Sequence, residues 1–122
     1  QLPAALYTFG SPRVGDKEFV SALESKHLDN HRFVDCCDIV TRVPPEGFWG
    51  YTHIGKPYYI DLGRAIAQRD PSDPYICKDQ TSAEEQYLLN YAWRVGDVAV
   101  RPLADHAPIN YVWPVSAAPA GI

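Results

Sequence analysis

The spacing of apolar residues in the first third of the chain predicts a strand, a helix and a second strand. Residues Leu2–Phe9 favour a strand, which Gly10 and the following proline bring to an end. Asp16 is a candidate N-cap for an amphipathic helix that continues to about Lys26. The chain turns apolar again at His31–Cys36, which we expect to be the second strand. A strand–helix–strand unit of this kind implies a parallel sheet and an α/β fold.

The middle of the chain contains aromatic residues separated by glycines. Tyr51–His53 and Pro57–Leu62 are predicted to be short strands of a hairpin that turns at Gly55. Residues 67–79 contain two prolines and are predicted to be a loop. Residues 81–95 begin with a serine and a glutamate in capping-box spacing, so we expect a helix to start there.

Composition and charge exclude several classes of protein. The chain has 122 residues, 46% of them hydrophobic and 21% charged, which is typical of one soluble globular domain. Its net charge is −4 and its basic residues are scattered, so no nucleic-acid partner is expected. The stretch Gln1-Leu2-Pro3 lacks the features of a signal peptide and reads as the middle of a longer sequence, which leaves the compartment open.

Three cysteines are present, and none of them suggests a metal centre. Cys36 and Cys37 are adjacent, and a disulfide between neighbours is strained, whereas a bond from one of them to Cys77 stays open in an oxidising compartment. Too few cysteines and histidines lie at ligand spacing for a zinc site. We expect the adjacent pair to be small buried residues beside a strand end, and no metal or organic cofactor to take part.

The candidate catalytic residues are Asp38 and His106. Asp38 follows the end of a predicted parallel strand, where functional groups gather in α/β sheets, although such an acid can also simply cap a turn. His106 lies in a polar loop late in the chain, just before a short apolar piece, Ile109–Val112. An acid at a strand end followed at long range by a loop histidine is the order found in the α/β-hydrolase triad. We expect His27 and His31 to be exposed and His53 to be a structural, hydrogen-bonded histidine.

The order of four motifs resembles that of the class 3, fungal-type (Rhizomucor-like) triacylglycerol lipases. The motifs are "LYTFGSPRVGDKEF", "HRFVDCCDIVTRVPP", "GYTHIG" and "DHAPINYV". The resemblance covers most of residues 5–112 and implies the C-terminal portion of an α/β-hydrolase fold, with a mostly parallel sheet and flanking helices. It implies that Asp38 is the triad acid and His106 the triad histidine, and that His53 is structural or near the site.

The chain departs from the lipase pattern in its nucleophile. That serine belongs on a G-x-S-x-G turn, and no serine here has glycine two residues before and two after it. Ser11 is followed by a proline that is incompatible with such a turn. We therefore expect residues 1–122 to be a partial hydrolase domain that lacks the N-terminal part with the nucleophile and the oxyanion hole.

The resemblance implies an acylglycerol or other carboxylic ester hydrolase, here a fragment that is inactive alone. The expected partners are a lipid ester substrate, the missing N-terminal half of the domain, and transiently a lipid interface. We also expect self-association through the exposed strand at Leu2–Phe9. Phe48, Trp49 and Tyr51 belong either to an acyl groove or to the core. The alternative is a non-catalytic lipase-like domain that binds lipid or protein.

Overall fold

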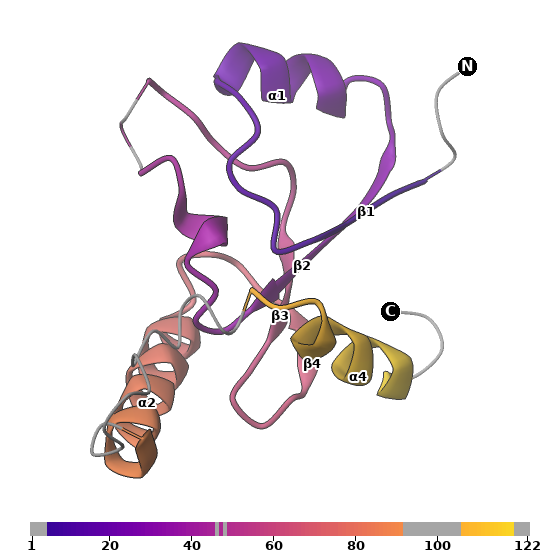
Figure 1. Ribbon diagram of the computed structural model, residues 1–122. Helices are drawn as coiled ribbons and strands as arrows, with labels where there is room; N and C mark the ends of the chain where they lie inside the picture. Colours follow the sequence, from indigo (N-terminus) through magenta and orange to yellow (C-terminus); the bar gives the residue numbers. More distant parts are fainter. Residues whose placement is uncertain (1–4, 46, 48, 92–105, 119–122) are drawn as a thin grey trace.

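The computed structural model describes residues 5–45, 47, 49–91 and 106–118, and it shows a sheet with helices around it (Figure 1). The elements in chain order are β1 (Ala5–Phe9), α1 (Lys17–Glu24), β2 (Asp29–Asp35), the 3-10 turn η1 (Val40–Arg42), β3 (Pro57–Ile60), β4 (Ile66–Gln68), α2 (Pro74–Tyr91) and α4 (Ile109–Ala117).

The sheet has the strand order β1-β2-β3-β4 and is mostly parallel. The first three strands run parallel, with Phe9 opposite Phe33 and Phe33 opposite Tyr58, and β4 runs antiparallel to β3. The predicted strand–helix–strand unit is therefore confirmed as β1-α1-β2, and with it the α/β class. Within the described residues β1 lies at the edge of the sheet, and self-association through it stays a prediction.

Local capping explains where α1 begins. The Asp16 side chain accepts a hydrogen bond of 2.8 Å from the backbone N–H of Phe19, as the sequence predicted for an N-cap. Glu18 places a negative charge in the first turn, where the helix dipole favours it. Val20 is the buried residue of this short helix and marks the face that is covered.

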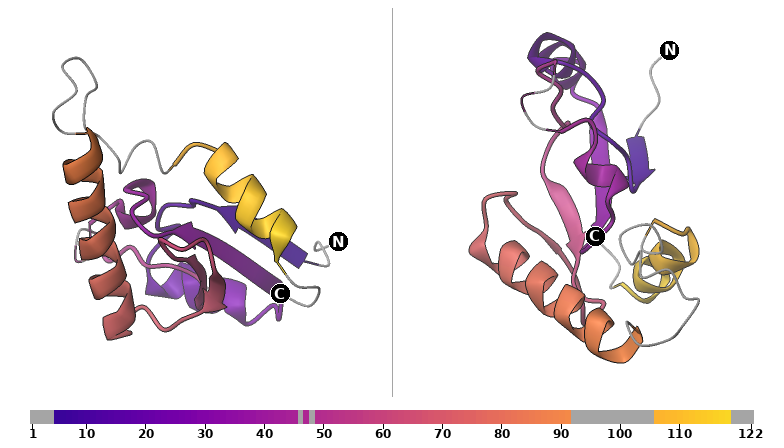
Figure 2. Two further views of the ribbon diagram at one scale, coloured as in Figure 1. Left: turned by 90° about the horizontal axis from the view of Figure 1, so that it is seen from below. Right: turned by 60° about the vertical axis from the view of Figure 1, so that its left-hand side comes forward.

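The two faces of the sheet carry separate apolar clusters, because successive side chains of β2 point to opposite faces. Val34 packs with the two buried cysteines, Tyr59 and Ala83 of α2. Phe33 packs on the other face with Ile60 and with Tyr111 of α4. The two further views show the sheet between α2 and α4 (Figure 2).

The predicted hairpin at Gly55 is wrong. Thr52 forms an isolated antiparallel bridge with Gly15, far away in the sequence, instead of pairing with β3. The hairpin is β3–β4, and its turn is closed by Asp61, which accepts from the backbone N–H of Ala65 at 2.9 Å. The error arose because β-propensity near Tyr51 does not reveal which partner a strand finds.

The predicted loop at residues 67–79 is also wrong in part, because α2 begins at Pro74 and not near Ser82. Asp73 accepts a hydrogen bond of 2.9 Å from the backbone N–H of Tyr75. Asp followed by Pro is a favoured start for a helix, since proline needs no N–H partner in the first turn. The short apolar piece at Ile109–Val112 proves to be the first part of helix α4.

All three cysteines are free thiols. Cys36 and Cys37 are buried, with their sulfur atoms 3.5 Å apart, and Cys77 is exposed. In the described part of the chain there is no group of three metal-ligating side chains, and no helix there has the length and apolar character needed to cross a membrane.

Candidate active site

The structure brings Asp38 and His106 together although they are 68 residues apart. Asp38 follows the carboxyl end of β2, and His106 precedes α4. The Nδ1 atom of His106 lies 3.0 Å from Oδ2 of Asp38. The pair thus lies beyond the carboxyl ends of the parallel strands, where α/β folds place their functional groups.

The Asp38 carboxylate is buried and held from several sides, with only 1% of the residue exposed. Its Oδ1 atom accepts a hydrogen bond of 2.8 Å from the backbone N–H of Val40. Its backbone carbonyl accepts one of 2.8 Å from the hydroxyl of Thr41. Turn η1 therefore fixes the direction in which the carboxylate faces His106.

Tyr111 of α4 provides a further donor to Asp38, which sequence analysis missed. Its hydroxyl donates to Oδ2 of Asp38, the same oxygen that faces His106, and accepts from the backbone N–H of Asp35 at 3.2 Å. Burial, and next the hydrogen bond to Asp38, raise the pKa of Tyr111 well above the ordinary phenol value. The hydroxyl therefore stays a neutral donor throughout the ordinary pH range.

Gly10, directly after β1, lies against the pair. Its φ of +61° is in the left-handed region that favours glycine. A Cβ atom at this position would lie 2.5 Å from Oδ2 of Asp38 and 2.8 Å from Nδ1 of His106. Only glycine leaves room for the hydrogen bond between the two side chains.

The geometry gives His106 the tautomer of a general base. A carboxylate accepts hydrogen bonds, so a neutral imidazole in this position carries its proton on Nδ1 and its lone pair on Nε2. Nε2 lies on the opposite side of the ring, and the His106 side chain is 44% exposed. The arrangement can accept a proton from a hydroxyl group presented at that open side.

A second buried acid, Asp35, stands beside this pair and was also missed. Its Oδ2 atom lies 2.6 Å from the guanidinium of Arg64, and its Oδ1 atom accepts from the backbone N–H of Cys36 at 2.8 Å. Arg64 also donates to the side chain of Asn110 at 3.2 Å. Because Asn110 precedes Tyr111 on α4, this cluster attaches that helix to the end of β2.

Comparison with known proteins finds a family that resembles the first part of the chain. Residues 1–48 match the family model of lipase (class 3). Over this part of its length, the chain is similar to the class 3 lipases. The matched residues include Gly10 and Asp38, and His106 lies outside them.

Individual relatives agree with the family model. A lipase from Rhizomucor miehei is 44% identical over 55 residues, which is 45% of this chain and 15% of that protein. Secreted mono- and diacylglycerol lipase 1 from Fusarium solani is 35% identical over 75 residues, 62% of this chain and 22% of that protein. This chain therefore spans about a fifth of the length of these relatives, or less.

A solved structure extends the likeness to the fold. The Rhizomucor miehei lipase in its propeptide complex superposes with a TM-score of 0.50 and 33% identity, over 59% of this chain and 26% of that one. Together with the mostly parallel open sheet and its flanking helices, this likeness identifies part of an α/β-hydrolase fold.

The other three histidines lie away from the Asp38–His106 pair's hydrogen bond and differ in their surroundings. His53 is structural as predicted, since its Nε2 lies 2.7 Å from the carbonyl oxygen of Thr41 in the turn that holds Asp38. His27 is exposed as predicted. The prediction of an exposed His31 is wrong, because its ring is half-buried and stacked on Tyr7 at 4.5 Å.

No serine hydroxyl in the described part of the chain is hydrogen-bonded to His106. The Ser11 hydroxyl donates instead to the carbonyl of Pro12 at 3.1 Å. Of the aromatic candidates for an acyl groove, Phe48 lies outside the described residues. Trp49 is 73% exposed, so the suggestion that it belongs to the core is wrong.

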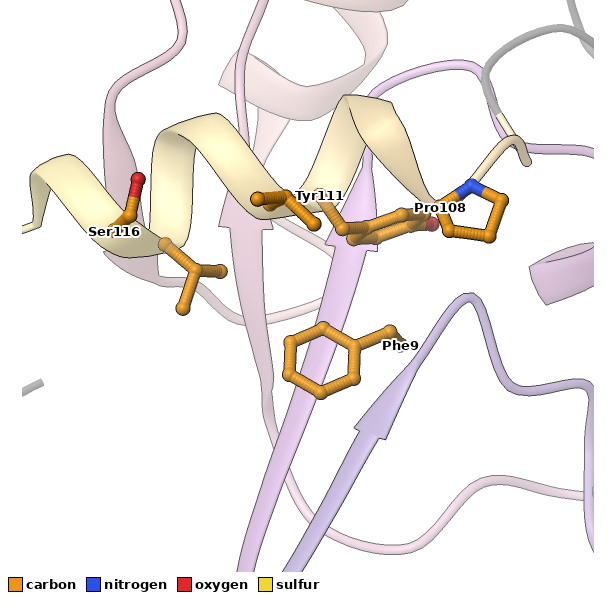
Figure 3. Close-up of a pocket in the computed structure, with 6 residues that line it drawn as sticks. Phe9, Pro108, Tyr111 and Ser116 are labelled. Carbon is orange, nitrogen blue, oxygen red and sulfur yellow. The ribbon is translucent and has the colours of Figure 1, made fainter.

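An apolar pocket of about 390 Å³ lies beside the pair, between β1 and α4 (Figure 3). The rings of Phe9 and Tyr111 meet edge to face across it, with centroids 6.1 Å apart. Tyr111 thus presents its ring to the pocket and its hydroxyl to Asp38. The residues lining the pocket are Phe9, Pro108, Tyr111, Val112, Val115 and Ser116.

Proposed function

We propose that these 122 residues are part of a class 3 lipase that hydrolyses carboxylic esters of the acylglycerol type. The observation that carries the proposal is the hydrogen bond between Asp38 and His106, whose side chain is 44% exposed. The names of the relatives, which are lipases and a mono- and diacylglycerol lipase, support the substrate class.

In the proposed mechanism His106 acts first as a base and then as an acid. Its Nε2 takes the proton of a serine hydroxyl while the serine oxygen bonds to the ester carbonyl carbon. The tetrahedral intermediate then expels the alcohol, to which His106 returns the proton. Water repeats the cycle on the acyl-enzyme and releases the fatty acid. Asp38 keeps Nδ1 protonated and stabilises the imidazolium.

The serine in this proposal comes from outside residues 1–122. None of the six serines here stands in a G-x-S-x-G turn: Ser11, Ser21, Ser25, Ser72, Ser82 and Ser116. A base and an acid without an activated nucleophile supply little catalysis. We accordingly propose that the 122-residue chain by itself does not hydrolyse esters.

The test is to label the complete natural gene product with a fluorophosphonate, which reacts with activated serines. We expect labelling of the wild type on a serine preceding Gln1, and labelling strongly slowed by His106→Gln. The 122-residue chain serves as the matched control and should remain unlabelled. A complete product with no reactive serine would contradict the proposal and favour a lipase-like domain that binds lipid or protein.

A further inference from the structure

Arg32 is a buried arginine, with 5% of its surface exposed, in the middle of β2. Its guanidinium donates to the carbonyl oxygens of Ile54 at 3.3 Å and of Gly55 at 3.4 Å, both long for hydrogen bonds. Within the described residues no carboxylate pairs with it. A buried arginine is almost always paired with an acid. Arg32 therefore lacks the usual compensating negative charge within the described residues.

Two more cations converge on the same place. Arg32, Arg13 and Lys17 line one cavity of about 570 Å³, and its lining contains no aspartate or glutamate in the described part of the chain. Burial, and next the charge of Arg13, lower the pKa of Arg32 to about 10. Three basic side chains thus line one cavity in a chain whose net charge is −4.

The Arg13 guanidinium donates to the backbone carbonyl oxygens of Arg42 and, at 2.6 Å, of Pro44, whereas the surrounding structure does not explain the charges of Lys17 and Arg32. Lys17 lies in the first turn of α1, where the helix dipole disfavours a positive charge. The carbonyl of Ile54 already receives a neutral donor, the side-chain amide of Asn30, at 3.4 Å. A polar neutral side chain would satisfy these carbonyls without placing a charge inside the protein.

We propose that this cavity binds an oxyanion, the chemistry shared by a phosphate group and a carboxylate. An arginine presents a planar set of N–H groups that suits both anions. Tyr51 and Thr52, which also line the cavity, add hydroxyl groups beside the three cations. The site lies on the face of the sheet opposite α4, because Arg32 and Phe33 point to opposite faces, and it does not depend on the proposed esterase activity.

The experiment measures thermal unfolding of the 122-residue chain at neutral pH and constant ionic strength, with inorganic phosphate, butyrate or chloride at millimolar concentration. We expect phosphate or butyrate to raise the Tm in a saturable way. Lys17→Ala should weaken the apparent affinity by roughly fivefold, as expected for losing one partly exposed charge. Lys78→Ala on α2, outside the lining, is the matched control and should leave the affinity unchanged.

Arg32→Met separates binding from a structural role. We expect this variant to lose the saturable response and, without anion, to be at least as stable as the wild type, because an uncompensated buried charge is gone. A variant that is less stable without anion yet still responds would overturn the proposal. So would a non-saturating rise shared by both proteins, which is the general effect of phosphate on protein surfaces.

A direct measurement covers the case in which Arg32→Met does not fold. In the wild type, the side-chain Nε–H signal of Arg32 should shift with the same saturation curve as the Tm. An Arg32 signal that neither phosphate nor butyrate moves would overturn the proposal. A response to phosphate alone identifies a phosphate-bearing ligand, and a response to butyrate alone identifies a carboxylate.

Discussion

Two buried aspartates at the end of β2 have different partners. Asp35 and Asp38 are three residues apart and each is 1% exposed. Asp35 faces the guanidinium of Arg64, whose charge is permanent, whereas Asp38 faces an imidazole and a phenol. One carboxylate is thus paired with a cation, and the other accepts from a phenol that keeps its proton and faces an imidazole that can accept or donate one.

The difference in partners gives the two aspartates different roles: Asp35 is structural, and Asp38 can take part in chemistry. A guanidinium only donates hydrogen bonds, so the pair of Arg64 and Asp35 can hold α4 but offers no imidazole-like base. An imidazole can both accept and donate a proton, so the pair of Asp38 and His106 can support proton transfer. Tyr111 joins the two clusters, because its hydroxyl contacts both the Asp38 carboxylate and the backbone of Asp35.

The largest expected effect is the loss of nucleophile activation in Asp38→Asn. The amide would donate to Nδ1 of His106 and force the proton onto Nε2, the wrong tautomer for a base. In the complete natural product we expect fluorophosphonate labelling to slow about 10⁴-fold. Asp35→Asn should slow it less than about tenfold, because that acid touches no reacting group. Equal losses in the two variants would remove the distinction between the two aspartates.

The next effect concerns stability, in Arg64→Met. Removing the guanidinium leaves the Asp35 carboxylate, whose side chain is 0% exposed, without its cation. Breaking a buried pair from one side typically costs about 3–5 kcal/mol, which urea unfolding of the 122-residue chain can measure. Lys56→Met is the matched control, since Lys56 lies 3.8 Å from Asp70 in an exposed pair and should cost less than about 1 kcal/mol.

A smaller loss is expected for Gly10→Ala. The new methyl group would press on both Asp38 and His106 and adopt a left-handed backbone, for a total of roughly 2–4 kcal/mol. Gly50→Ala is the matched control, because Gly50 has a similar left-handed backbone, with a φ of +70°, but no atom lies within 4 Å of the new Cβ. This variant should cost only about 1 kcal/mol. The NMR signal of the His106 Nδ1–H should shift only in the first variant. An unchanged signal in Gly10→Ala would mean that the pair tolerates the methyl group.

The sequence predicted best those elements that local chemistry determines. The N-cap at Asp16 and the apolar spacing of β1, α1 and β2 are local, and these elements were found close to their true positions. The start of α2 was missed although Asp73-Pro74 is itself a local signal, because two prolines nearby favoured a loop. The hairpin was misplaced because its turn depends on Arg64, a non-glycine residue with a φ of +69°.

The candidate site also contains residues that the sequence predicted and residues that it did not predict. Asp38 and His106 were predicted through the order of motifs, since spacing alone cannot show that residues 68 positions apart meet. Tyr111 was not predicted because it lies in an apolar segment. Asp35 was not predicted because the order of motifs points to the neighbouring Asp38. Both were missed because their roles rest on contacts between β2 and α4, and a single sequence contains no record of these contacts.

The smallest effect tests whether Tyr111 positions the pair. Tyr111→Phe removes a hydrogen bond to a buried carboxylate and should cost about 2 kcal/mol. The raised pKa means that the hydroxyl contributes this free energy below the ordinary value of about 10, and loses it only as the pH rises through the higher value of the folded protein. The difference in unfolding free energy between wild type and variant should therefore be constant between about pH 7 and pH 9.

Tyr59→Phe is the matched control, because the Tyr59 hydroxyl also donates to a carboxylate, that of Asp79, at 2.9 Å. Both variants should lose stability, but only Tyr111→Phe should shift the Nδ1–H signal of His106. Tyr111 shares Oδ2 of Asp38 with that proton, whereas Tyr59 belongs to the cluster on the other face of the sheet. If both variants lose stability and neither moves the signal, Tyr111 stabilises the fold without positioning Asp38.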